Sequence, residues 1–415
     1  MNERLLTLLV VIFLSTVAFG QQGQTLRDRD PDLAAAKKLA ADLQQANLHR
    51  GPFYLISRIR LADAGFSETA FVPTGDSSGG ISFTVEAPQR LYFVPRKKTI
   101  YSLEVVPGYS WFNEGGRKGQ FNYLVRGDAH FLLNHLYLDV YALRADQLRA
   151  HVADINRLAT TREDEAGVAG ELKYSSRTSA LFSVRLRDTT YPLNRFQPDT
   201  PPAREIPIEV LDRTEQNGRL SLQHKTFPRT SLFVAGEISD YDFKNKASYA
   251  SRRTYAGGGF LYDAGRTQVR VEAGPMKLDF KDPVEPDYEG LTAQIRATRA
   301  NGRRTFYAGA SRDLGFSLFA NNAFYIATAA HAGVDHIATR KLTLHARTAF
   351  ERDDYETEVN GLHRRDDISF SSVGFTYGVR AVRFGVDVGW YERDSTAFGD
   401  VDSGIRYVLR LSLTP

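Results

Sequence analysis

Ten residues near the C-terminus read Val382-Arg-Phe-Gly-Val-Asp-Val-Gly-Trp-Tyr391, with an apolar residue at every second position until the final Tyr. The last segment of the chain repeats this pattern, with arginines among the apolar residues Ile405, Tyr407, Leu409, Leu411 and Leu413. Successive side chains of a β-strand point to opposite faces. Each segment therefore predicts a strand with one apolar face and one polar face.

Two environments suit such a strand. In a soluble β-sandwich the polar face meets bulk water, whereas in an outer-membrane barrel it lines the lumen and the apolar face meets lipid. The composition favours the barrel, because the chain has 20 Tyr, 26 Phe and 33 Gly but only 2 Met, and its mean hydropathy is −0.35. Beyond the first 20 residues no apolar run is long enough for a membrane-spanning helix. The net charge of +4 gives no reason to expect a nucleic-acid partner.

The N-terminus predicts export. Arg4 precedes an apolar run from Leu5 to Phe19, and Ala18-Phe19-Gly20 supplies small residues at the positions that a signal peptidase reads. We expect residues 1–20 to be a signal peptide cleaved after Gly20. A membrane anchor helix is the alternative, but the run is short for a span. The chain has no cysteine, which excludes a lipid-modified cysteine, a disulfide and a thiolate metal site.

Residues 21–52 are expected to form an N-terminal periplasmic segment with a short amphipathic helix. Asp32 can cap a helix that starts near Leu33, and Gly51-Pro52 would end it. Its apolar face is mostly alanine, which suits a periplasmic lead-in or a plug in the barrel mouth better than a membrane-binding helix.

Residues 53–415 are expected to form an all-β, transmembrane, antiparallel up-and-down β-barrel. The alternation predicts 18 strands, or 16 if a weak N-terminal pair drops out, and both numbers are even as a bacterial barrel requires. The predicted strands are 53–61, 81–94, 99–111, 121–131, 134–144, 167–176, 178–188, 218–227, 229–240, 252–262, 266–280, 288–299, 303–312, 323–338, 341–353, 366–377, 382–393 and 403–414.

The lengths of the connections alternate, which is typical of barrels with short periplasmic turns and long outer loops. The predicted short turns are 263–265, 300–302, 339–340 and 378–381. The predicted long loops are 241–251, 281–287, 313–322, 354–365 and 394–402.

Two upstream regions are less regular. Residues 189–217 contain five prolines and predict a long outer loop or an inward-folded constriction. Residues 145–166 carry Leu148, Val152, Ile155 and Leu158 at helical spacing and suggest a partly helical segment.

We find no catalytic, cofactor-binding or metal-binding motif and expect a non-enzyme. His130 and His135 flank a predicted turn and could approach each other, but two weak ligands do not make a metal site. Gly257-Gly258-Gly259 lacks the Lys and the helix of a phosphate-binding loop and suggests close packing or a bulge within a strand. Asp353-Asp354 and Asp366-Asp367 are expected to be solvated residues at the ends of one outer loop, and attraction of Ca²⁺ or of cations that bridge lipopolysaccharide is the alternative.

The polar faces of the predicted strands identify candidate pore-lining residues. Arginine outnumbers carboxylate among them, so a pore would lean weakly toward anions or polyhydroxylated solutes. The alternative is a lumen of mutually neutralising ion pairs that holds the wall rigid. The candidates are Arg126, Asp128, Arg185, Arg187, Arg270, Glu272, Arg296, Arg347, Glu351, Arg383, Asp387, Arg406 and Arg410.

The alternation, the loop lengths and the terminal hairpin with Arg383, Asp387, Tyr391 and Tyr407 give the chain its family resemblance. It resembles Gram-negative outer-membrane β-barrels of the porin type and, more loosely, the barrel family associated with exopolysaccharide secretion operons. The resemblance covers most of residues 53–415. It departs from many such barrels at the C-terminus, which carries Leu413-Thr414-Pro415 where they have a terminal aromatic residue for the insertion machinery.

This resemblance implies a monomeric or trimeric outer-membrane channel for passive passage of small hydrophilic solutes or polysaccharide. Its expected partners are outer-membrane lipid, lipopolysaccharide and the barrel-insertion machinery. Two other functions are open: a barrel enzyme that acts on lipids, and a non-conducting scaffold or adhesin whose outer loops bind a partner.

Overall fold

The computed structural model describes residues 39, 42–67, 80–112, 119–151, 157–192, 195–196, 206–318, 322–359, 362–396 and 401–414. The predicted signal peptide and the start of the predicted N-terminal helix lie outside these residues. Leu39 and residues 42–44 are helical, which is the described part of that helix. Among the described residues no helix is long and apolar enough to span a bilayer.

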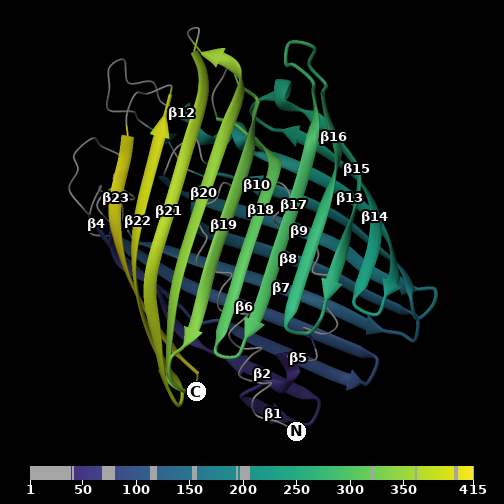
Figure 1. Cartoon of the computed structure of the whole chain (residues 1–415), viewed down its shortest axis with the longest axis vertical. Helices are drawn as coiled ribbons and strands as arrows, with labels where there is room; N and C mark the ends of the chain where they lie inside the picture. The colour runs from purple at the N-terminus through teal and green to yellow at the C-terminus, as the bar shows by residue number, and fades with distance from the viewer. Residues whose placement is uncertain are drawn as a thin grey trace.

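The described strands form a closed antiparallel β-barrel with 18 wall strands (Figure 1). The first two wall strands are each interrupted once. β2 (Phe53–Ser57) continues as β3 (Ile59–Ser67), and β4 (Gly80–Glu86) continues as β5 (Gln89–Arg96). β2 pairs with β5, β3 pairs with β4, and β23 (Val401–Leu413) pairs with β3. This last pairing closes the barrel.

Each of the other wall strands pairs with the next one along the chain and matches one predicted segment. These strands are β6 (Thr99–Phe112), β7 (Gln120–Leu132), β8 (Leu136–His151), β9 (Arg157–Lys173), β10 (Thr178–Thr190), β13 (Arg213–Phe227), β14 (Thr230–Phe243), β15 (Ser251–Asp263), β16 (Thr267–Phe280), β17 (Tyr288–Asn301), β18 (Arg304–Phe316), β19 (Phe324–Ile337), β20 (Leu342–Val359), β21 (Leu362–Val379) and β22 (Val382–Ser395).

Four short elements complete the described chain. They are β1 (Leu48–Arg50), the β11 (Arg195–Phe196) and β12 (Ile206–Pro207) pair, and the 3-10 helices η2 (Ile208–Leu211) and η3 (Ala247–Tyr249). β1 pairs with β2 below the barrel, close to the N-terminal label in Figure 1.

The predicted alternation of connection length is confirmed. One end of the barrel carries eight short turns, at residues 97–98, 133–135, 174–177, 228–229, 264–266, 302–303, 338–341 and 380–381. The connections between the other ends of the wall strands are longer, except for residues 360–361 between β20 and β21. The C-terminus lies at the short-turn end, where the Thr414 amide donates to the Ala381 carbonyl at 2.8 Å.

The outward face of the wall is apolar and exposed. Val184 on β10 is 63% exposed, Leu220 on β13 is 53% exposed, and Val234 and Ile238 on β14 are 61% and 54% exposed. Such a continuous apolar surface would be unfavourable in water and is what the hydrocarbon region of a bilayer contacts.

The sequence-based prediction is wrong in residues 145–166 and 354–365. Residues 145–166 are not helical in the described part, because β8 runs to His151 and β9 starts at Arg157. Most of the predicted loop 354–365 belongs to β20 and β21, which leave only residues 360 and 361 between them. In both places the strands extend beyond their apolar bands, so the alternation that marks a strand in the sequence is lost.

Candidate functional site

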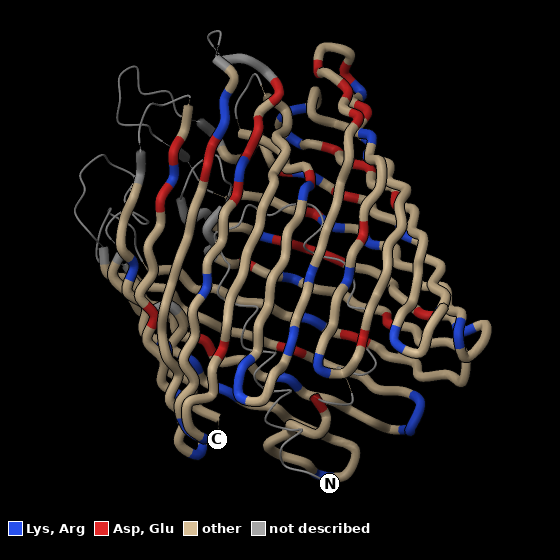
Figure 2. The backbone as a smooth tube through the Cα atoms, viewed as in Figure 1, with Lys and Arg blue, Asp and Glu red and all other residues tan. Residues whose placement is uncertain are grey.

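The inner face of the barrel carries a network of charged side chains. Arg219 on β13 contacts Glu237 on β14 at 3.0 Å and Glu272 on β16 at 2.6 Å. Arg253 on β15 contacts Asp313 on β18 at 2.9 Å. Because these contacts pass over intervening strands, the side chains lie on the concave side of the wall. Figure 2 shows charged positions along the middle of the strands as well as at their ends.

Six of the predicted pore-lining arginines have an identified polar partner. The pairs are Arg126–Asp128 at 2.7 Å, Arg185–Glu215 at 2.9 Å, Arg187–Glu165, Arg270–Glu272 at 2.9 Å, Arg410–Asp387 at 2.5 Å, and Arg347, whose Nε donates to the Tyr307 hydroxyl at 2.8 Å. The wall therefore contains the neutralising ion pairs that were one of the two predicted lumen types.

The remaining predicted residues differ in exposure. Glu351 is 4% exposed, Arg406 is half-buried, and Arg296 and Arg383 are exposed. Arg296 lies two residues from the buried Gln294 and shares its face of β17. Their role in lining a solute pathway stays a prediction.

Sequence reasoning missed several carboxylates of this network. Glu165 was placed in the supposed helical segment and Glu215 in the long loop, yet both lie in wall strands and pair with arginines. Arg162 and Asp164, which precede Glu165 and lie on the other face of β9, are polar too. With both faces polar, β9 shows no alternation at this height.

His130 belongs to a polar cluster near the short-turn end of the lumen. One ligand atom each from Asp128, His130 and Asp139 lie within 4.8 Å of one another. Arg126 contacts Asp128 at 2.7 Å and Asp139 at 3.9 Å, and His130 Nδ1 lies 2.9 Å from Asp139. Arg126 offsets part of the carboxylate charge, and Asp128 already accepts hydrogen bonds from Arg126 and Ser102, so the geometry is that of a hydrogen-bonded network. The second histidine of the predicted pair, His135, lies in the exposed turn that follows β7.

One residue of each acidic pair at β20 and β21 is not the solvated loop residue that we expected, whereas Asp354 and Asp367 are partly exposed on the other face. Asp353 and Asp366 are both fully buried and face each other across the strand pair. Asp366 accepts hydrogen bonds from Arg364 and Arg393, each at 2.6 Å. The strands continue to this height, so these carboxylates point into the barrel.

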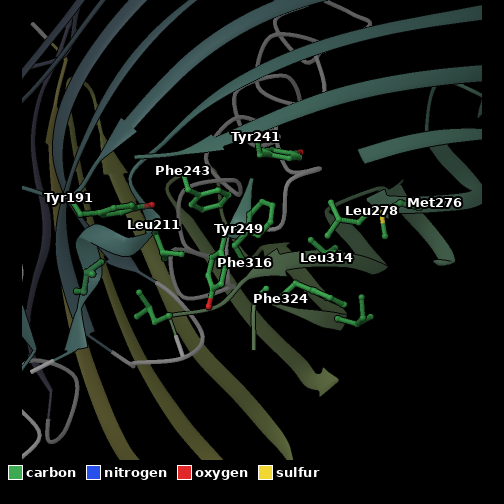
Figure 3. Close-up of a cluster of buried hydrophobic side chains, with 14 residues drawn as sticks. Tyr191, Leu211, Tyr241, Phe243, Tyr249, Met276, Leu278, Leu314, Phe316 and Phe324 are labelled. Atoms are coloured by element: carbon green, nitrogen blue, oxygen red, sulfur yellow. The ribbon is translucent and has the colours of Figure 1, made fainter. Parts of the chain in front are cut away.

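An apolar cluster occupies part of the inner side toward the long-loop end (Figure 3). It contains Tyr191, Ile208, Leu211, Tyr241, Phe243, Tyr249, Met276, Leu278, Leu314, Phe316, Leu318, Ala323, Phe324 and Ile326. Tyr241 and Phe243 share one face of β14 with the buried Glu237, so the cluster continues the inner face.

Two segments fold inward to form this cluster. One is η2, whose Ile208 and Leu211 are 4% and 2% exposed. It belongs to the predicted region 189–217, for which an inward-folded constriction was one of two alternatives. The Tyr191 amide donates to Asp212 at 2.7 Å and ties together the two ends of this connection.

The second segment is the upper part of the β18–β19 hairpin. β17 and β18 pair only as far as Ala293 and Arg312. Phe316 shares a face of β18 with Phe306, which is 42% exposed on the outside of the barrel. The Phe316 ring nevertheless packs 5.0 Å from Tyr241 and 4.9 Å from Phe243. The hairpin thus bends into the barrel above Arg312, and the predicted outer loop 313–322 is wrong for its described part.

The opposite mouth is contacted by the N-terminal segment. Asp42 forms an ion pair with Arg90 at 2.8 Å and accepts a hydrogen bond from the Tyr92 hydroxyl at 2.9 Å. Leu39 packs with Ile56, Tyr92 and Ile100. The helical turn is therefore attached to β2, β5 and β6 at the short-turn end.

A closed barrel with an apolar outer band and an ion-paired inner face defines the class: this is an outer-membrane β-barrel of the porin type. The sequence profile of the family described as "Putative beta-barrel porin 2" matches residues 150–409. The chain belongs to this family. A comparison with curated proteins finds no match.

Several solved porin structures share the fold. Pseudomonas aeruginosa OpdK, solved with vanillate, has 12% identity and a TM-score of 0.51, and the match covers 87% of this chain and 99% of OpdK. A BenF-like porin from Pseudomonas fluorescens Pf-5 has 11% identity and a TM-score of 0.50, with coverage of 87% and 99%. Pseudomonas aeruginosa OpdG has 10% identity and a TM-score of 0.51, with coverage of 87% and 98%. At these identities the likeness concerns the fold.

Proposed function

We propose that the chain is a porin-like channel for the passive passage of small hydrophilic solutes across the outer membrane. The observation that carries this proposal is a closed barrel whose inner face is polar and ion-paired along the described strands. Polar groups inside a barrel replace part of the hydration of a passing solute, which an apolar lumen cannot do.

The two inward segments bear on the size of the solute. η2 and the β18–β19 hairpin occupy the lumen with bulky side chains, among them Leu211 and Phe316. They leave less room than an open barrel of the same strand number. This supports a small solute, comparable to the vanillate with which OpdK was solved, over a polysaccharide chain.

The charges support only a weak ion preference. The candidate pore-lining residues include nine arginines and four carboxylates. Glu165 and Glu215 offset part of that excess by pairing with Arg187 and Arg185. We therefore propose a slight preference for anions, with the thirteen candidate residues as the first places to test it.

Planar-bilayer recording of the purified full chain tests the proposal. We expect discrete current steps. In a KCl gradient we expect a small reversal potential with the sign of a channel that is more permeable to chloride than to potassium. Liposomes that contain the protein should swell in small sugars and amino acids but not in dextrans. A barrel that is folded by its heat-modifiable gel migration, yet gives neither current nor swelling, would contradict the channel.

A further inference from the structure

The eight short turns have an unusual composition. Together they contain nine Lys and Arg residues and no Asp or Glu. Seven of the eight turns contribute at least one of them, and blue positions mark the hairpin tips at the lower end of Figure 2. We call this set the short-turn collar: Lys97, Lys98, Arg177, Arg229, Arg266, Arg303, Arg340, Lys341 and Arg380.

The collar residues differ from the cations of the wall. All nine are exposed, and within the described part of the chain none of them forms an ion pair with a carboxylate. Their recorded side-chain contacts are to neutral groups: Lys98 Nζ donates to Asn134 Oδ1 at 2.7 Å, and Arg303 Nη1 to the Ala338 carbonyl at 3.4 Å. Wall arginines such as Arg219 and Arg253 are buried against carboxylates. The collar charges thus remain available to a ligand.

The sequence segments that connect the opposite ends of the wall strands have the opposite balance. They contain seven Lys and Arg against twelve Asp and Glu, counted in the sequence over residues 68–79, 113–119, 152–156, 191–212, 244–250, 281–287, 317–323, 360–361 and 396–400. If the charged residues served only to keep the connections soluble, both signs of charge would be expected in the short turns and in the other connections. Of the two sets of connections, only the short turns carry an excess of positive charge.

Exposed aromatic side chains place this rim at a lipid interface. Tyr174 is 66% exposed and Phe227 is 65% exposed, and each lies within three residues of a collar cation. Phe306 and Tyr377, three residues from Arg303 and Arg380, are 42% and 43% exposed. Aromatic side chains of this kind lie at headgroup level in membrane proteins, so the collar sits at the height of the lipid phosphates.

We propose that the short-turn collar binds the anionic headgroups of phospholipids in the periplasmic leaflet of the outer membrane. The distribution favours lipid over an acidic protein, because a bound protein contacts one side of the rim whereas lipid surrounds all of it. Each Lys or Arg near an anionic surface strengthens binding by about fivefold. The attraction is electrostatic and weakens as salt rises.

Lipid retention by the full-length barrel tests the proposal. The protein is reconstituted into bilayers of equimolar phosphatidylglycerol and phosphatidylcholine, extracted with mild detergent, and its retained lipids are counted by native mass spectrometry. We expect phosphatidylglycerol to exceed phosphatidylcholine at low salt and the excess to disappear in high salt. The triple variant Arg229→Gln, Arg266→Gln and Arg340→Gln should retain less than half of that excess.

A matched variant removes three cations from the other rim: Lys244→Gln, Lys246→Gln and Lys281→Gln. It should retain phosphatidylglycerol as the wild type does. Heat-modifiable migration of each variant shows that its barrel is folded. Equal retention of the two lipids by the wild type would overturn the proposal, as would equal losses in the two variants. Salt-sensitive binding to peptidoglycan without a lipid preference would overturn it too.

Discussion

Gly259 on β15 occupies a position where a side chain does not fit. A Cβ atom there would lie 1.8 Å from the Val271 carbonyl oxygen and 2.8 Å from the Phe233 ring. Phe233 is buried inside the barrel beneath the Arg270 guanidinium, whose carbon lies 5.4 Å from the ring centre. The close packing predicted for Gly257-Gly258-Gly259 is confirmed at this residue.

Gly259→Ala should therefore destabilise the barrel, because β15 or Phe233 must move. We expect a loss of about 1–3 kcal/mol in the free energy of unfolding. Gly218→Ala on β13 is the matched control, since nothing lies within 4 Å of its Cβ position. Urea unfolding in detergent micelles measures both variants. Equal midpoints for the two would show that the wall absorbs the methyl group at Gly259.

Neighbouring arginines on β15 offer a second comparison. Arg253 and Asp313 have side chains that are each 1% exposed, whereas the side chain of Arg252 is 60% exposed and pairs with Asp240. Arg253→Met leaves a buried carboxylate without its main partner, which costs about 3–5 kcal/mol. Arg252→Gln should change little, because water screens an exposed pair. Thermal gel-shift midpoints test this difference, and a larger loss for Arg252→Gln would contradict the assignment of inner and outer faces.

At the scale of elements, two segments fold into the lumen and narrow it. A barrel wall could close without this inward folding. η2 is held by Ile208 and Leu211, and the β18–β19 hairpin by Phe316 against Phe243. These contacts are apolar, within a lumen that is otherwise ion-paired. They keep the two segments folded inward rather than solvated above the barrel.

The double variant Leu211→Ser and Phe316→Ser should release these segments and enlarge the single-channel current. Each substitution removes about 2–5 kcal/mol of packing, which is comparable to what holds a short segment in place. Val284→Ser is the control, because Val284 is 84% exposed in a long connection outside the cluster. Planar-bilayer recordings compare the single-channel currents of the wild type, the double variant and Val284→Ser. An unchanged current in the double variant would show that the cluster does not border the ion path.

At the scale of the whole molecule, the barrel separates the lipid around it from the polar lumen inside it. Its outward side chains contact lipid and its inward charges neutralise one another across strands. Closure by β23 and β3 pairs the edge strands, and this is what the hydrocarbon region demands of backbone amides and carbonyls.

Val234→Arg tests which solvent the outer face meets. Val234 is 61% exposed near the middle of β14, and an arginine there should cost about 2–4 kcal/mol in a bilayer. Val284→Arg, in an exposed connection, should have no such cost. Folding into lipid vesicles, followed by the gel shift, measures both. If Val234→Arg folded as well as the control and gained solubility without detergent, the membrane assignment of this face would fail.

The sequence by itself determined the number of strands, the apolar central part of each strand, and most of the order of short and long connections. It could do so because a bilayer imposes a period of two wherever a strand crosses it. Only the tertiary structure decided which carboxylates pair with Arg185 and Arg187 and how deeply Asp366 is buried. It also decided that β18 and η2 bend into the barrel. Above the lipid band both faces of a strand are polar, and contacts that pass over neighbouring strands leave no periodic trace along the chain.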